Sequence, residues 1–219
     1  MSMRFVVCVA VFCGLLSGCA TLTEEECQIL NWEAEGREAG EFGGGPTSYS
    51  RLASQCSRYA IAPDYDAFER GRQQGLVRFC TPDGVYIAGL AGRGSTAQCA
   101  AGDPNLTLIH QTALNYTRAT RELSRARNAL EQSIRYRNNA REDVFNLRRR
   151  LRDEEDPEEI ENLERRLRRE LRLISQYEID EARLFFEIAD RERALTRAEF
   201  DLDRVRSEFG LGFGPYSYY

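Results

Sequence analysis

Two long stretches with a seven-residue hydrophobic repeat make up the second half of the chain. The first runs from Asp103-Pro104 to Arg152 and the second from Asp156-Pro157 to Phe209, and neither has a glycine or proline after its opening pair. Aspartate followed by proline is typical of a helix N-cap and first helical position. We therefore predict two helices of about 75 Å each. The linker 153–156 is so short that the helices must be antiparallel, which predicts a coiled-coil hairpin over residues 103–209.

The repeat assigns two series of contact positions to each helix. The first helix has one series of Ile109, Tyr116, Leu123, Leu130, Arg137, Val144 and Leu151, and another of Leu106, Ala113, Thr120, Arg127, Ile134, Arg141 and Arg148. The second has one series of Ile160, Leu167, Ile174, Glu181, Ile188, Leu195 and Leu202, and another of Leu163, Glu170, Tyr177, Leu184, Arg191, Ala198 and Val205. Folding the chain about its linker sets Leu123 beside Ile188 and Arg141 beside Glu170. Cysteines at Leu123 and Ile188 are therefore expected to form a bridge, whereas Leu123 with Leu195 is not.

The pattern before residue 103 is different, with shorter segments and many glycines. Residues 24–40 read as one short helix, and Pro63-Asp64 opens another in which apolar residues recur at helical spacing. The turn 81–84 is followed by Val85-Tyr86-Ile87, which predicts a short strand. The expected fold class is mainly α, with a small disulfide-stapled α(+β) domain at 19–102 ahead of the hairpin.

Two pairs of glycines four residues apart mark the predicted helices of this domain. Gly36 and Gly40 form the first pair, and Gly71 and Gly75 the second. Such pairs remove side chains from one helix face, which favours close packing of another helix. The alternative is a ligand that approaches the bare backbone. On that interpretation a small molecule or glycan would bind a surface of Trp32, Gly36, Gly40, Gly71, Arg72 and Gly75.

The first eighteen residues have the features of a bacterial export signal. Arg4 precedes an apolar run from Phe5 to Leu16, which is too short to span a membrane. The segment Leu16-Ser17-Gly18-Cys19 resembles the lipobox of bacterial lipoproteins. The resemblance implies cleavage before Cys19 and lipidation of its thiol and new amine, which would anchor the chain almost permanently. Ala20 in place of aspartate favours the outer membrane by resemblance to the sorting rule of enteric bacteria.

Four cysteines remain for the exported domain once Cys8 and Cys13 leave with the signal and Cys19 takes lipid. In an oxidising compartment the four, Cys27, Cys56, Cys80 and Cys99, are expected to form two disulfides. No pair has the spacing of a zinc or redox motif. Three connectivities are possible. Local order favours Cys27–Cys56 with Cys80–Cys99, and spacing alone does not decide.

Composition removes several classes of chemistry. The chain has no lysine, one histidine (His110), and 35 acidic against 30 basic residues for a net charge of -5. These counts exclude a lysine Schiff base, a phosphate loop with lysine and a multi-histidine metal site. We expect no cofactor, no metal and no nucleic-acid partner. The arginine clusters 148–150 and 165–169 are interleaved with glutamates four residues away, which favours a solvated, salt-bridged helix face.

The spacing of special residues across 16–101 resembles a family. The series is Gly18-Cys19-Ala20, Cys27, Trp32, Gly36, Gly40, Gly43, Cys56, Pro63-Asp64, Gly71-Arg72, Gly75-Leu76, Cys80-Thr81-Pro82, Gly84, Gly89, Gly92 and Cys99. It resembles an uncharacterised family of small bacterial lipoproteins that contain a domain of unknown function. Asn31, Ala39 and Phe68 depart from that pattern. The resemblance implies fold and location and brings no activity.

These observations lead to a functional hypothesis without an enzymatic step. We expect a lipid-anchored envelope protein whose hairpin serves as a spacer or docking arm for an envelope partner, with the 19–102 domain as a possible ligand-binding module in the alternative. An enzyme using Asp64, Asp66 and Glu69 is disfavoured because these carboxylates lack a recognisable partner spacing. His110 is interpreted as structural. Residues 210–219 are expected to form a flexible aromatic tail.

Overall fold

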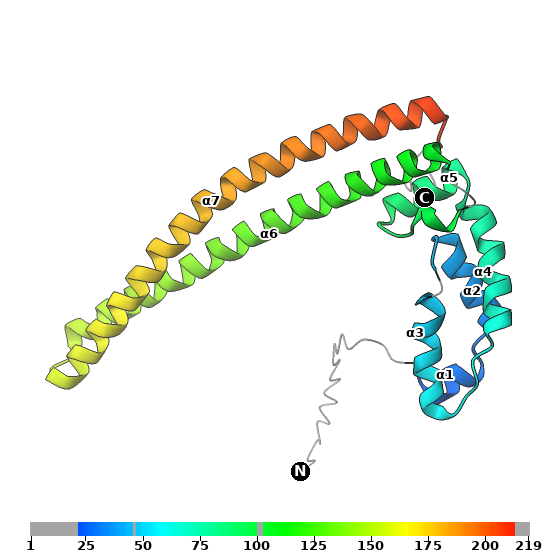
Figure 1. The fold of residues 1–219 in the computed structure, drawn as a ribbon. Coiled ribbons are helices and arrows are strands. Elements are labelled where there is room, and N and C mark those ends of the chain that lie inside the picture. The colour runs from blue at the N-terminus through cyan, green and yellow to red at the C-terminus, as the bar shows by residue number, and fades with distance from the viewer. Residues whose placement is uncertain (1–21, 46, 100–102, 213–219) are drawn as a thin grey trace, which may run out of the picture.

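The chain folds into a small helical head and a long two-helix arm (Figure 1). The computed structural model describes residues 22–45, 47–99 and 103–212, and these contain helices and loops but no strand. The head consists of residues 22–99, and the arm consists of α6 and α7. In chain order the helices are α1 (Glu24–Gln28), α2 (Trp32–Glu41), α3 (Thr47–Cys56), α4 (Tyr65–Phe79), α5 (Pro82–Leu90), α6 (Pro104–Asp153) and α7 (Pro157–Phe209), with 3-10 turns at Ser57–Tyr59 and Thr96–Gln98.

The single helix predicted over residues 24–40 is wrong, because the segment forms two helices. Thr23 begins α1 with a capping box to Glu26. The chain then breaks after Gln28, and Asn31 begins α2 by accepting a hydrogen bond from the backbone N–H of Ala34 at 3.0 Å. An asparagine whose side chain binds the backbone is a favourable N-cap and a poor interior residue. The periodicity of apolar residues concealed this restart.

The strand predicted at Val85-Tyr86-Ile87 is also wrong, since these residues lie inside α5. Thr81 caps that helix through its hydroxyl, which accepts from Gly84 N–H at 3.0 Å, and proline occupies the first turn. Val85 and Tyr86 are almost fully buried. The cap and this burial outweigh the β propensity of three branched and aromatic residues.

Both disulfides favoured by local order are present. Cys27 joins Cys56, which ties α1 to the end of α3, with a Cα–Cα distance of 5.4 Å. Cys80 joins Cys99 at 5.5 Å and ties the end of α4 to the segment that leads into the arm. Each bridge closes a loop in a head with a small core, where such staples contribute most.

The head and the arm share one hydrophobic core. Its buried members come from α4, α5, the first turns of α6, the last turns of α7 and the segment after α7: Leu76, Phe79, Val85, Tyr86, Ala88, Leu106, Ile109, Ala113, Leu202, Val205 and Leu211. The predicted boundary between residues 102 and 103 therefore divides residues that pack together. Leu211 is 8% exposed, so the predicted flexible tail is fixed at its start, and residues 213–219 lie outside the described residues.

The bounds of the two arm helices confirm the predicted hairpin. Asp103 and Asp156 cap α6 and α7, each with proline in the first turn. The connection is Glu154 to Asp156, and Gly210 ends α7 in the left-handed conformation with φ of 61°. The arm extends away from the head and is bowed along its length (Figure 1).

The seam of the arm confirms three of the four predicted series and corrects the fourth. Both series of α7 and the Ile109 series of α6 are buried or half-buried throughout. On α6, however, the other series is Thr112, Ala119, Ala126, Ser133, Ala140 and Leu147, whereas Arg127 and Arg141 are exposed. Small residues carry a weak hydrophobic signal, so the prediction followed Leu106 and Ile134. A charge-free run of six positions was the signal that identifies the seam.

The predicted pairing of Arg141 with Glu170 is consequently wrong. The guanidinium of Arg141 instead donates to Glu178 at 2.9 Å on the exposed side of the arm. Arginine side chains on a helix lean toward its N-terminus, so this residue meets α7 closer to the head than its Cα position suggests. The pairing of Leu123 with Ile188 stays a prediction.

Candidate functional site

The four glycines of the predicted ligand surface lie between α2 and α4, whose backbones are in contact. A Cβ atom on Gly36 would lie 1.9 Å from the carbonyl oxygen of Phe68, and one on Gly71 would lie 1.9 Å from that of Glu33. On Gly40 and Gly75 the nearest backbone oxygens would be 2.2 Å away. The opposing helix fills the space that a ligand would need. Close packing therefore accounts for these glycines, and a ligand on bare backbone does not.

The two side chains predicted beside the glycines are buried as well. Trp32 is 8% exposed, and its ring lies tilted against the ring of Tyr49 with the centroids 5.8 Å apart; Tyr49 also contacts Phe68. Arg72 is 7% exposed. Its guanidinium donates to both carboxylate oxygens of Glu69, at 2.7 and 2.6 Å. A bidentate pair of this kind fixes the orientation of both side chains.

The Arg72–Glu69 pair explains the electrostatics of this part of α4. Hydrogen bonds from Arg72 lower the pKa of the Glu69 carboxyl, against an opposing effect of burial. The same hydrogen bond raises the pKa of Arg72. Both shifts favour the charged forms, which suits a structural ion pair better than a proton-transferring group. Asp64, another carboxylate considered for catalysis, caps α4 by accepting from Ala67 N–H at 2.8 Å, while Asp66 is exposed.

His110 lies in the shared core, as expected for a structural residue. It is 1% exposed, its Nε2 lies 2.8 Å from the carbonyl oxygen of Arg93, and its ring contacts the edge of Phe79. The contact ties the loop after α5 to the base of α6. The ring is covered on all sides, so no substrate can reach it from solvent.

A cleft that the sequence did not indicate opens between α2, α3 and the loop after α5. Its volume is about 630 Å³, and it is lined by Glu35, Glu38, Phe42, Arg51 and Arg93, together with the glycine run 43–45. Arg93 lies over the ring of Phe42 at 4.9 Å. The glycine run 43–45 was the available signal. The lining of the cleft thus combines one aromatic ring with carboxylate and guanidinium groups.

Glu35 is the perturbed acid of this cleft. Partial burial raises the pKa of its carboxyl, and the neighbouring negative charge of Glu38 raises it further. A carboxylate held in this way gains from a cationic neighbour that neutralises it. The cleft can therefore hold a small polar group that carries a positive charge near Glu35 and a negative charge near the arginines.

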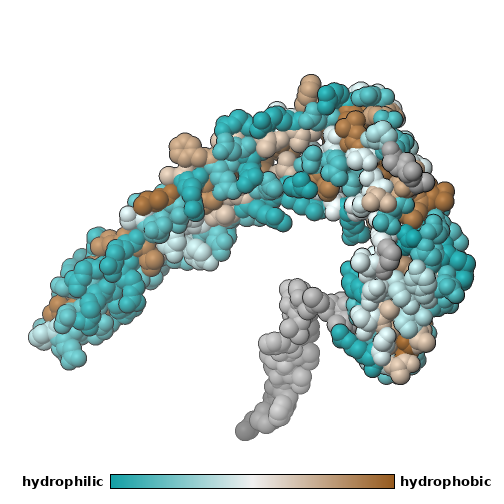
Figure 2. Space-filling view, viewed as in Figure 1, coloured by the Kyte–Doolittle hydropathy of each residue, from teal (hydrophilic) through white to brown (hydrophobic). Residues whose placement is uncertain are grey.

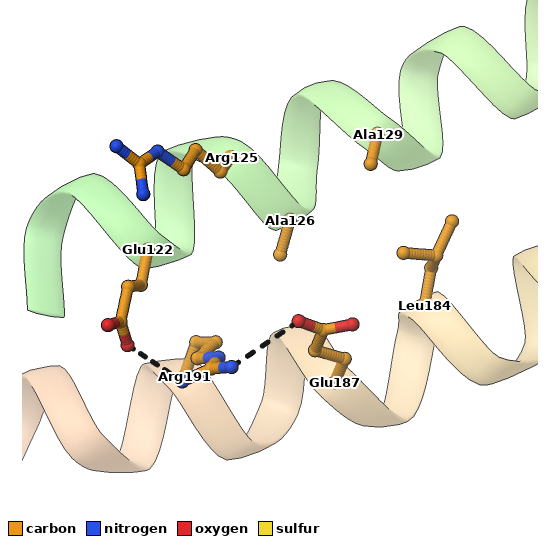
Figure 3. A pocket seen from close by; sticks show the side chains of 7 residues that line it. All are labelled: Glu122, Arg125, Ala126, Ala129, Leu184, Glu187 and Arg191. Atoms are coloured by element: carbon orange, nitrogen blue, oxygen red, sulfur yellow. Dashed lines mark hydrogen bonds and ion pairs between the residues drawn. The ribbon is translucent and has the colours of Figure 1, made fainter.

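The arm is held by charges as well as by apolar layers. Arg137 and Glu181, both at seam positions, form an ion pair of 2.6 Å with side chains only 21% and 9% exposed. Nearer the head, Arg191 bridges Glu122 of α6 at 2.7 Å and Glu187 of its own helix at 3.5 Å. A gap of about 390 Å³ adjoins this bridge, where two alanines of α6 face Leu184 (Figure 3).

Three arginines of the clusters 148–150 and 165–169 form ion pairs with glutamates, which agrees with the predicted salt-bridged helix face. Arg165 pairs with Glu161 at 2.5 Å and Arg168 with Glu164 at 3.2 Å, each one helical turn apart. Arg150 reaches across the tip to Glu159 at 3.1 Å. These contacts neutralise the charges of Arg150, Arg165 and Arg168 locally.

Two kinds of site do not occur in the part of the chain that the structure describes. No three histidine, cysteine, aspartate or glutamate side chains converge there as metal ligands. None of the described helices combines the length and the apolar composition that crossing a bilayer requires.

Comparison with known proteins identifies a domain but not an activity. Residues 31–114 match the family model described as "Protein of unknown function (DUF2799)". Comparisons with curated proteins and with solved structures give no match. The matched residues end inside α6 at Leu114, so the family pattern includes the base of the arm along with most of the head. The stretch that is similar to this family therefore packs in one core with the base of a long hairpin.

Proposed function

We propose that this chain is a lipoprotein of the bacterial cell envelope, anchored through Cys19 in the outer membrane, whose arm acts without catalysis as a spacer or docking arm. Cys19 and the signal segment lie outside the described residues, so this location rests on the lipobox resemblance. The supporting observation in the fold is the shared core. A rod of about 75 Å that begins inside the core of the head cannot swing freely.

The base of the arm is what makes a spacer role physically reasonable. Ile109 and Ala113 are completely buried, and they meet Val205 from the other arm helix in the same core as Phe79. Bending the arm at its base would expose these apolar side chains to water, at about 25 cal/mol per Å². The position of the tip is therefore fixed relative to the head.

The tip offers the chemistry for a partner. The linker 153–156 and the first turn of α7 carry a cluster of acidic residues at the end of the arm remote from the head (Figure 1). A basic surface on an envelope protein would complement it. The anchor, the head and the tip then lie in series between the membrane and that partner.

The first test shortens the arm without disturbing its heptads. Deleting 130–143 from α6 and 168–181 from α7 removes two heptads from each helix, about 21 Å of length. It removes both members of the Arg137–Glu181 and Arg141–Glu178 pairs. A photo-crosslinking residue at Glu155 reports contact at the tip, and one at Asn128, on the outer side of α6, is the control.

A spacer that docks at its tip gives an adduct from Glu155 in the full-length protein, and the shortened arm loses this adduct at unchanged protein level. An identical adduct pattern in the shortened variant would refute a spacing role. No adduct from the tip reporter would refute docking there. For the anchor, Cys19→Ala is expected to abolish fatty-acid labelling and release the protein from membranes.

The cleft supports a second candidate function, binding of a small molecule or glycan by the head. We propose that it takes ligands carrying both an amine and a carboxylate, because Glu35 and Arg93 face the same space. Soluble peptidoglycan fragments are a suitable probe because they combine a glycan with such groups. Titration followed by intrinsic fluorescence should saturate for the wild type and weaken at least tenfold in Glu35→Gln with Arg51→Ala. Equal binding by both proteins would rule the cleft out.

A further inference from the structure

The outer face of α7 carries an apolar stripe that nothing in the described chain covers. Ile179, Phe186 and Phe200 are 63%, 76% and 70% exposed. They are separated by seven and fourteen residues, so they lie in one line on the helix, on the side opposite the seam. Apolar patches stand out along the arm in the space-filling view (Figure 2).

The stripe has the composition of a second coiled-coil seam. Ala182 and Ala189 lie three residues after Ile179 and Phe186, which completes an alternation of three and four residues. The face continues through Arg193 and Thr196 to Phe200. We call residues 179, 182, 186, 189, 193, 196 and 200 the outer seam. Phe185, 58% exposed, lies along its edge.

The corresponding face of α6 shows that an apolar outer position is not a general property of this arm. From residue 121 to residue 149 the residues of α6 opposite its own seam are exposed and, apart from Phe145, polar or charged; one line of them is Arg121, Asn128, Arg135, Glu142 and Arg149. Charged residues are what a solvated coiled-coil surface normally carries there. The outer seam is therefore specific to α7, and its pattern is that of a surface that packs against another helix.

The charges beside the outer seam indicate which helix that is. In a parallel, in-register coiled coil, a residue at one flank of the seam meets the residue five positions later on the other chain. Along α7 this rule joins Glu178 to Arg183, Glu192 to Arg197 and Glu199 to Arg204. The fourth pair is Phe185 with Asp190. Three of the four flanking pairs between two copies of α7 are thus oppositely charged.

We propose that the outer seam binds a second copy of this chain, with the two α7 helices parallel and in register. An antiparallel pair would place one flank against itself, which brings glutamate beside glutamate and arginine beside arginine. Arg193, the charged member of the outer seam, lies next to Glu192 of the second copy in the parallel pair. A single polar residue in a seam fixes register at some cost in stability.

The flanking carboxylates have capacity for these contacts. Glu178 and Glu192 each accept one hydrogen bond from α6, from Arg141 at 2.9 Å and from Arg127 at 2.8 Å. Both side chains nevertheless remain about half exposed, at 49% and 50%. A carboxylate accepts several hydrogen bonds. The intermolecular pairs therefore add to the bonds that hold the hairpin together.

In this dimer the two arms lie side by side and point in the same direction. Their four helices form one rod, with both heads at the same end. This inference rests on the faces of α7 alone and stands whether or not the chain is lipid-anchored. It predicts that the rod presents two acidic tips side by side.

Single cysteines in the full chain, expressed with its own export signal, test the orientation. In a parallel, in-register pair Ile179→Cys, Ala189→Cys and Phe200→Cys each lie next to the same residue of the second copy, so all three are expected to give disulfide-linked dimers. Asn128→Cys, exposed on the outer face of α6, is the matched control and is expected to stay monomeric. Bridging at only one of the three would indicate an antiparallel pair and overturn the proposal, as would bridging at none.

Association itself is tested with the purified full chain in detergent by light scattering. Phe186→Glu with Phe200→Glu should weaken dimerisation about 100-fold, while helix content by circular dichroism stays unchanged because both rings are exposed. Phe145→Glu is the control, since Phe145 is 65% exposed but lies on α6 near the tip. A wild-type monomer at tens of micromolar, or a dimer that survives the double substitution, would overturn the proposal.

Discussion

The crossing of α2 with α4 and the seam of α6 with α7 solve the same packing problem in opposite ways. In the head, glycines let two backbones touch, so the contact has no spare volume. In the arm, side chains of mixed size keep the helices apart and leave gaps such as the one beside Ala126 and Leu184 (Figure 3). The head is therefore built to hold one geometry. The arm is built to extend a long distance and tolerates local imperfection.

The largest effect is expected where the crossing is closed. Gly36→Val and Gly71→Val each place a side chain against a carbonyl oxygen of the opposite helix, so the helices must separate. We expect a loss of at least about 4 kcal/mol or failure to accumulate. Protein yield and urea unfolding measure this. Gly212→Val is the matched control, because no atom lies within 4 Å of a Cβ there. Normal stability of the Gly36 and Gly71 variants would disprove the close crossing.

Loss of the bridge that joins the head to the arm comes next. Cys80→Ser with Cys99→Ser is expected to lower the free energy of unfolding by about 2–4 kcal/mol. The arm should keep its helices, because its own seam remains. Thermal unfolding followed at 222 nm would then separate into two transitions. A single transition at the wild-type temperature would contradict the idea that this bridge stabilises the shared core.

The buried ion pair of the arm gives a smaller and asymmetric effect. Arg137→Met leaves the carboxylate of Glu181 buried without its partner, which should cost about 2 kcal/mol. Arg137→Met combined with Glu181→Leu replaces the pair by apolar volume and should restore stability. Urea unfolding of the two variants makes the comparison. Equal destabilisation by both would show that the charges contribute more than apolar packing in this seam.

The smallest effect concerns pH. The folded pKa of Glu69 is depressed by Arg72, so its contribution to stability is complete above the unfolded pKa and is lost as pH falls through the folded value. We expect about 1 kcal/mol of wild-type stability to disappear because of this group as the pH falls from neutral through its folded pKa. Glu69→Gln should lack that part of the pH dependence. If the stability of the two proteins depended on pH in the same way, the Arg72–Glu69 pair would not contribute to the pH dependence.

The sequence predicted long-range features where one strong pattern repeats. The hairpin bounds follow from two Asp-Pro caps and about fifty residues free of glycine. Both disulfides have the pairing that local order favoured, although spacing alone left three connectivities open. The errors occurred where a single side chain outweighs the pattern. Asn31 interrupts a periodic stretch, Thr81 starts a helix through residues of high β propensity, and Ala126 is buried although Ile134 has the stronger hydrophobic signal.

The candidate site was harder to foresee than the fold. For Gly36 and Gly71 the sequence allows two interpretations, close helix packing and a ligand on the bare backbone. Only the distances from these glycines to the opposing carbonyl oxygens decide in favour of packing. The cleft around Glu35 brings together residues from three separate segments. Its formation depends on how α3 and the loop after α5 pack against α2, and no local pattern encodes that arrangement.

The central claim is that the head and arm form one rigid body because they share a core. Spin labels at Arg70 on α4 and at Asn128 on α6, measured by double electron–electron resonance in the dilute full chain, test it most directly. If the head and the arm are one rigid body, the distance between the two labels has one narrow distribution, and this distribution does not change when a partner is crosslinked to the tip. A broad distribution, or two separate distances, would show that the arm swings at its base.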